Sequence, residues 1–205
     1  MWQNHRATGV MALVLGVSAG GGAAQTVPTT LEDFFLPGHQ PNAPGNPIVL
    51  DPFVGVMEGS CVNCHADFTT YPAAEPFRHW AGSMMAQAMR DPLFQASLVI
   101  ANQDAAFAGD LCLRCHTPAG WLGGRSLPPD GSGLSEPADF EGAACHFCHR
   151  IVDAHYVDGV SPAEDVPILA ALEAVGLLPA QADSGRFVVD PDDKIERRPI
   201  TTGRP

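Results

Sequence analysis

Cysteine and histidine recur together in a fixed pattern along this chain of 205 residues. All six cysteines fall in three C-x-x-C-H units: Cys61, Cys64 and His65; Cys112, Cys115 and His116; Cys145, Cys148 and His149. Two thiols three residues apart share one helical turn, where each can bond a vinyl group of the same porphyrin. The adjacent histidine is then placed to ligate the iron. The pattern therefore predicts three haem c groups, each covalently bound through one unit.

Zinc binding and disulfide formation are the alternative uses of paired cysteines. A zinc site uses two converging C-x-x-C pairs, so three pairs would leave one pair over. Disulfides between such close neighbours are strained, and neither alternative requires a histidine after every second cysteine. The repeated histidine favours haem, with His65, His116 and His149 as proximal iron ligands. We expect the haems to supply much of the core, and the chain to be largely unfolded without them.

Two histidines outside the motifs are candidates for ligating the second face of an iron. His79 lies beside Trp80 on the apolar face of a predicted helix, where a core histidine is the alternative. His155 follows the third motif by six residues and could reach an adjacent iron. The candidate metal ligands are therefore His65, His116, His149, His79 and His155.

The remaining histidines and the methionines are weaker candidates. His146 lies between the cysteines of its own motif, so we expect a solvated or bridging role for it. His39 lies in a Pro- and Gly-rich segment that could still deliver a ligand. Met84, Met85 and Met89 are interpreted as core residues rather than ligands, because methionine fills irregular gaps beside rings.

The elements that must position these residues are short. Helices are predicted near 76–90 and 92–106, each with a proline in its first turn. A further helix is predicted over 162–178, and a strand at 186–189. The expected fold class is mainly α with extensive loops, in which short helices wrap around three covalently attached c-type haems.

Segments rich in proline and glycine connect the motifs. Residues 25–57 are expected to wrap over the haems, and 117–140 to form a long turn-rich loop. Trp121 in that loop either stacks on a haem or anchors the loop. The third motif begins 33 residues after the second, whereas the second begins 51 after the first, so we expect the second and third haems to form a close pair.

The N-terminus has the pattern of a secretory signal peptide over residues 1–24. Arg6 supplies its positive charge, residues 10–17 its apolar stretch, and residues 22–24 a small-residue cleavage site. The apolar stretch is too short to span a bilayer. We expect a periplasmic or extracellular protein with no membrane span after signal removal.

Two further segments follow the predicted signal. Residues 25–155 are expected to form a trihaem cytochrome c domain. Residues 156–205 contain neither cysteine nor histidine and therefore cannot attach or ligate haem. We interpret them as a haemless C-terminal extension or linker that could lead to a missing domain.

The composition is strongly acidic. Asp and Glu number 23 against 11 Lys and Arg, for a formal net charge of −12. Such a surface disfavours nucleic acid as a partner. It suits docking to basic patches on redox partner proteins, through contacts that are small and weakened by salt.

Residues from about 59 to 153 resemble multihaem c-type cytochromes of the cytochrome c-552/4 domain type, electron carriers that serve hydroxylamine oxidation. The shared features are the first motif, the helical pattern Trp80-x-x-Ser83, and further C-x-x-C-H units. The resemblance implies short helices around closely stacked haems. In that family a histidine often follows the serine by two residues and ligates iron, whereas this chain has Met85 there and three motifs rather than four.

The leading functional hypothesis is an exported multihaem cytochrome that transfers electrons through three haems. The alternative is a multihaem oxidoreductase in which one haem keeps an open site for a small nitrogen or sulfur compound. Lys194 is the only lysine and lies outside the motifs, which excludes a lysine-ligated catalytic haem. We expect a carrier rather than an enzyme, and we assign no catalytic residue.

Overall fold

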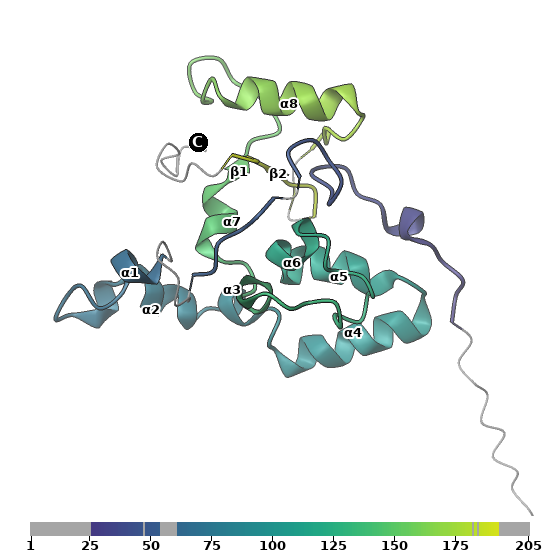
Figure 1. The fold of residues 1–205 in the computed structure, drawn as a ribbon, viewed down its shortest axis with the longest axis horizontal. Helices are drawn as coiled ribbons and strands as arrows, with labels where there is room; N and C mark the ends of the chain where they lie inside the picture. The colour runs from purple at the N-terminus through teal and green to yellow at the C-terminus, as the bar shows by residue number, and fades with distance from the viewer. Residues whose placement is uncertain (1–25, 47, 54–60, 182, 184, 193–205) are drawn as a thin grey trace, which may run out of the picture.

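The computed structural model describes residues 26–192, apart from 47, 54–60, 182 and 184. The predicted signal peptide therefore lies outside the described residues. Within them the chain is mainly helical, with one small two-stranded sheet (Figure 1). The expectation of a mainly α chain is thus confirmed.

The helices are short, and long connections join them. The described α-helices are α1 (Val62–His65), α2 (Pro76–Ala81), α3 (Met84–Gln87), α4 (Pro92–Asp104), α5 (Ala108–His116), α6 (Pro118–Leu122), α7 (Cys145–His149) and α8 (Asp165–Ala174). The 3-10 helices are η1 (Leu31–Phe34), η2 (Pro72–Ala74) and η3 (Pro137–Phe140). Strand β1 (Ile151–Val152) pairs antiparallel with β2 (Val188–Val189).

The predicted helix over 76–90 is in fact two helices, α2 and α3. Ser83 between them has an extended backbone, and its hydroxyl accepts a hydrogen bond from the amide of Ala86. The serine therefore caps a new helix instead of continuing the first. The helix predicted over 92–106 is confirmed as α4, which begins where the Asp91 carboxylate accepts from the amide of Leu93.

The segment 117–140 is more ordered than the expected loop. Helix α6 begins directly after the second motif, because the Thr117 hydroxyl accepts from the amide of Gly120 and Pro118 occupies the first turn. Helix η3 follows near the end of the segment. The helix predicted over 162–178 is confirmed in its central part as α8, and the strand predicted at 186–189 contains β2.

The apolar core of the described residues consists of several clusters. The largest joins α6 to β2 and to the N-terminal strap, the name used here for residues 26–46 and 48–53; it includes Ile48, Leu50, Trp121, Leu122, Phe187 and Val189. A second lies beneath α8, a third between α4 and α5, and a fourth around Phe53 and Trp80. The N-terminal strap thus contributes to the core, and the wrapping of residues 25–57 over haems stays a prediction.

The methionines divide between core and surface. Met89 is 4% exposed in the cluster between α4 and α5, as predicted. Met84 and Met85 are 74% and 53% exposed, so the prediction of a core position is wrong for both. The break at Ser83 gives α3 its own direction, which places these two side chains outward.

The segment after the third motif is part of the same fold. Helix α8 covers the two strands (Figure 1), and Leu169 and Leu172 pack on Val152 and Val188. The amide of Val189 donates to Nδ1 of His39 at 3.0 Å, which joins β2 to the N-terminal strap. Helix α8 and strand β2 therefore pack on the same core as the third motif, and the interpretation of residues 156–205 as a haemless extension or linker stays a prediction.

The buried His39 should make the stability of this fold sensitive to acid. The side chain is 1% exposed, and burial lowers its pKa to about 4. Between about pH 6.5 and pH 4 the unfolded chain binds a proton that the folded chain does not. The free energy of unfolding therefore decreases as the pH is lowered through this range, by up to about 3 kcal/mol. His39→Asn keeps an acceptor for the Val189 amide without titrating, and should flatten this dependence in urea unfolding.

The matched control is Asn42→Gln, which changes an exposed side chain of the same strap without changing the titrating groups, so the pH dependence should stay that of the unmodified protein. If the curve of His39→Asn runs parallel to that of the unmodified protein between these pH values, the assignment of the acid sensitivity to His39 is wrong.

Candidate functional site

Each C-x-x-C-H unit lies at the end of a helix. Helix α1 ends at His65, α5 ends at His116, and α7 runs from Cys145 to His149. Positions three apart on a helix are neighbours on its surface. Both cysteines of each unit therefore lie on the same side of one turn, as covalent attachment to one porphyrin requires.

The second motif opens on a cleft of about 520 Å³. Its lining comprises Cys112, Cys115 and His116 with Asp91, Leu93, Phe94, Ser97 and Leu111. Leu93 is 77% exposed on this wall, although burial of its side chain would be favourable. Two thiols and an imidazole beside an uncovered apolar wall are the surroundings that an attached porphyrin would cover.

The imidazole of His116 is oriented by two neighbours. Its ring stacks on Phe94 with the centroids 3.7 Å apart, and its Nδ1 lies 2.8 Å from the carbonyl oxygen of Ala88. A carbonyl only accepts hydrogen bonds, so Nδ1 carries the proton and the lone pair remains on Nε2. Metal-bound histidines have this arrangement, in which a backbone acceptor fixes the tautomer. The residues at the second motif thus fit a c-type haem.

The first and third motifs meet at another cluster. Cys61 and Cys145 both pack on the cluster around Phe53 and Trp80. Burial, together with the nearby Cys61 and Cys148, raises the pKa of the Cys145 thiol to about 11. The motif spacing led us to expect a close pair at the second and third motifs, whereas this contact joins the first and third.

The thiols of the second and third motifs lack the lowered pKa of a redox-active dithiol. The structure holds all six cysteines outside disulfides. Burial raises the pKa of Cys112, Cys115 and Cys148 as well. Reactive C-x-x-C pairs depend on a lowered thiol pKa, so the environment here does not favour disulfide exchange.

The two histidines predicted as additional iron ligands lie at the surface. His79 is exposed on α2, and its Nε2 is 2.6 Å from the carbonyl oxygen of Ala73. His155 is exposed beyond β1, where its amide donates to the Asp153 carboxylate. Iron ligation by either histidine stays a prediction.

His146 has the bridging role that we expected as one of two alternatives. It is 1% exposed, so the solvated alternative is wrong. Its Nδ1 accepts a hydrogen bond from the amide of Asp51 at 2.6 Å, which joins α7 to the N-terminal strap. The residue supplies an acceptor to a backbone amide, in the same way as His39.

Sequence reasoning missed the buried Arg150, which directly follows the third motif. Its Nε and Nη2 donate to the carbonyl oxygen of Asp190 at 2.8 and 2.6 Å, and its Nη1 donates to that of Val49 at 2.6 Å. The side chain is 2% exposed. It thereby holds the third motif to the strap and to the end of β2. The one feature of the sequence that could have indicated a structural role is its position directly after the third C-x-x-C-H unit. A lone arginine is otherwise predicted to lie at the surface.

Arg114 inside the second motif is buried in a similar way. Its Nη1 and Nη2 donate to the carbonyl oxygens of Leu36 and Pro37 at 3.1 and 3.0 Å, and its guanidinium lies 4.3 Å from the ring centre of Trp121. Burial lowers the pKa of Arg114 to about 10, which still leaves it charged at neutral pH. Of the two roles expected for Trp121, the structure shows an anchor: it is 3% exposed on α6.

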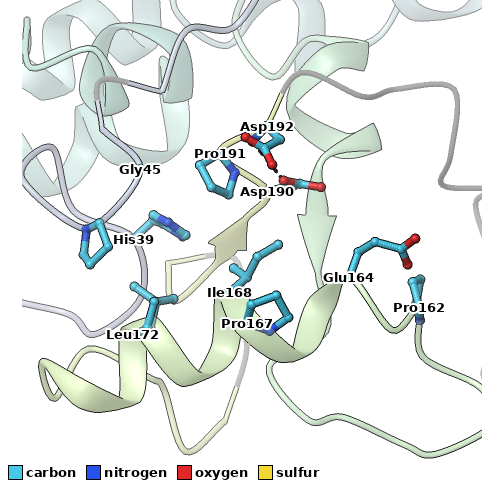
Figure 2. A pocket seen from close by; sticks show the side chains of 12 residues that line it. His39, Gly45, Pro162, Glu164, Pro167, Ile168, Leu172, Asp190, Pro191 and Asp192 are labelled. Carbon is cyan, nitrogen blue, oxygen red and sulfur yellow. Dashed lines mark hydrogen bonds between the residues drawn. The ribbon is translucent and has the colours of Figure 1, made fainter.

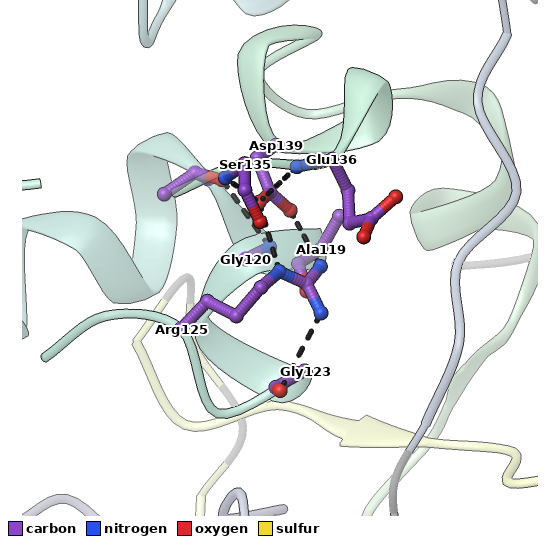
Figure 3. Close-up of polar contacts among 8 residues, drawn as sticks. Ala119, Gly120, Gly123, Arg125, Ser135, Glu136 and Asp139 are labelled. Atoms are coloured by element: carbon purple, nitrogen blue, oxygen red, sulfur yellow. Dashed lines mark hydrogen bonds and ion pairs between the residues drawn. The ribbon is translucent and has the colours of Figure 1, made fainter. Parts of the chain in front are cut away.

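An ion pair between the half-buried Arg125 and the buried Asp139 fixes the segment between α6 and the third motif. Arg125 donates to both carboxylate oxygens of Asp139, at 2.9 and 2.6 Å (Figure 3). The carboxylate also accepts from the amides of Ser135 and Glu136, each at 3.0 Å. Burial alone would raise the pKa of Asp139, but these hydrogen bonds outweigh it and lower the pKa. The pair therefore links the end of α6 to η3, shortly before Cys145.

Comparison with known proteins adds no family to this description. No family model, curated protein or solved structure matches the chain. Among the described residues, no group of three or more His, Cys, Asp and Glu side chains is placed to hold a bare metal ion. In the same part of the chain, no helix combines the length and apolar character that crossing a bilayer requires.

We expect Arg150→Ala to destabilise the protein by about 3 kcal/mol, because the carbonyl groups of Val49 and Asp190 lose buried donors. Arg150→Lys keeps the charge with fewer donors and should recover part of this loss. The free energy of urea unfolding measures both effects.

The control for Arg150 is Arg90→Ala. Arg90 is exposed, and its Nη2 donates to the carbonyl oxygen of Ala86 at 3.0 Å, so its removal should cost less than about 1 kcal/mol. An Arg150→Ala variant that is no less stable than Arg90→Ala would contradict the role assigned to Arg150.

Proposed function

We propose that this protein is a multihaem c-type cytochrome that holds one haem at each of its three motifs and passes single electrons among them. The cleft at the second motif carries the proposal, since two thiols and an imidazole with a fixed tautomer line it together. When bound, the haem iron supplies the one-electron chemistry. The chain supplies thioether attachment, the proximal imidazole, and apolar cover.

The arrangement of the other two motifs also supports electron transfer. Cys61 and Cys145 pack on the same cluster, which brings two attachment points into one part of the molecule. Arg150 and His146 tie the third motif to the strap and hold that attachment point in place. A carrier benefits from such rigidity, because fixed spacing between redox groups requires fixed attachment points.

The proposed setting is outside the cytoplasm. The signal pattern over 1–24 supports export, and haem propionates would add to the formal charge of −12. We infer docking to redox partner proteins that present basic patches, in encounters that salt weakens.

One observation favours an oxidoreductase as the second candidate. The residues that line the cleft at the second motif include His116, but neither a second histidine nor a methionine. A haem held there would have an open coordination position toward the described lining. A small nitrogen or sulfur compound could bind at that position.

Haem content tests the leading proposal. The purified protein should carry three covalent haems by pyridine haemochrome absorbance and intact mass, because each of the three motifs attaches one. Replacing both Cys112 and Cys115 by serine should remove one haem and leave the other two. Ser97→Ala, in the wall of the same cleft, should keep all three. Wild-type protein with fewer than two covalent haems would refute the proposal.

Spin state separates the two candidates. If the cleft lacks a second ligand, the ferric protein should show one high-spin haem by EPR and bind carbon monoxide when reduced. Leu93→His adds an imidazole to the cleft wall and should convert that signal to low spin. Val99→His adds one to an exposed position of α4 outside the cleft and should not. Only low-spin haems in the unmodified protein would rule out the oxidoreductase.

A further inference from the structure

A second cavity lies away from the cysteine motifs, between α8, the N-terminal strap and the end of β2 (Figure 2). Its volume is about 380 Å³, within the range of small-molecule sites. Its lining includes His39, Gly45, Glu164, Ile168, Leu172 and Asp192. No member of a C-x-x-C-H unit is among them, so the cavity is independent of the haem sites.

The walls of this cavity are preformed. Gly45 has a φ of +89°, and a Cβ atom there would lie 2.3 Å from the Cβ of Pro191, so only glycine allows this approach of the strap to the end of β2. Pro44 and Pro191 restrict the backbone at this approach, Pro162 and Pro167 restrict it beside α8, and the His39 ring is held by the amide of Val189. The entropic cost of ordering the site when a ligand binds would therefore be small.

The cavity combines an apolar floor with an acidic rim. Ile168, Ala171 and Leu172 supply the floor from one face of α8. Glu164 and Asp192 are exposed at the rim, while Asp190 is buried with the Asp192 amide donating to its carboxylate at 2.9 Å. None of the described lining residues is lysine or arginine. The Asp190 carboxylate is buried and already accepts from the Asp192 amide, so the carboxylates available to a ligand are mainly those of Glu164 and Asp192.

These features select one class of ligand. Anions are disfavoured by the carboxylates, and a bare metal ion would need ligands closer together than the described residues provide. An amine with a short hydrocarbon chain satisfies both parts of the lining. We propose that this cavity binds a small alkylammonium compound, with its chain on Ile168 and Leu172 and its charge facing Glu164 and Asp192.

Calorimetric titration of the purified, haem-loaded protein with n-pentylammonium chloride tests the proposal. We expect saturable binding at a single site with a Kd of about 1 mM or lower, and binding of pentan-1-ol that is weaker by about tenfold or more. Added salt should weaken the binding of the ammonium compound and leave the binding of the alcohol unchanged.

Variants assign the binding to this cavity. The double variant Glu164→Gln, Asp192→Asn should weaken the binding of pentylammonium by about tenfold, because both rim charges are lost while the side chains keep their shape. Glu173→Gln removes an exposed carboxylate of α8 outside the cavity and should change nothing. Equal binding of the alcohol, unchanged binding by the double variant, or no saturation would overturn the proposal. Haem content is measured on the same samples, so failure here is distinguishable from failure of the haem proposal.

Discussion

Buried donors and acceptors that join distant parts of the chain hold this fold together. A chain with 21 glycines and 19 prolines has many backbone groups outside regular helices and strands, and each one that is buried needs a partner. Arg150 supplies donors to Val49 and Asp190, while His146 and His39 supply acceptors to the amides of Asp51 and Val189. These contacts connect the strap, the third motif and the last strand beside the apolar clusters that also join them.

The same contacts explain why the C-x-x-C-H motifs and the second cavity belong to one structure. His39 lines the cavity and holds β2, and β2 pairs with β1 directly after the third motif. Apolar side chains remain uncovered elsewhere, as Leu93 does beside the second motif. Covalent haems would cover such surfaces and add to the stability of the chain, because binding to the folded state alone stabilises that state.

Much of the local structure could be predicted from sequence. Asp91-Pro92 predicted the start of α4, and the apolar spacing after residue 162 predicted α8. Both signals are local, because helix caps and periodicity act over a few residues. The break at Ser83 and the helix α6 were missed. Each depends on a hydroxyl that caps a helix, and a serine or threonine can equally point to solvent.

The sequence by itself determined the chemistry: three C-x-x-C-H units specify where haem is expected, since attachment and ligation are encoded within five consecutive residues. Only the tertiary structure decided which motifs adjoin, which way His116 is oriented, and that Arg114 and Arg150 lie inside. Cys61 and Cys145 pack on one apolar cluster, and Arg150 donates to the carbonyl oxygen of Val49, so both contacts join residues far apart along the chain. They depend on how the whole chain packs, which no local pattern of residues records.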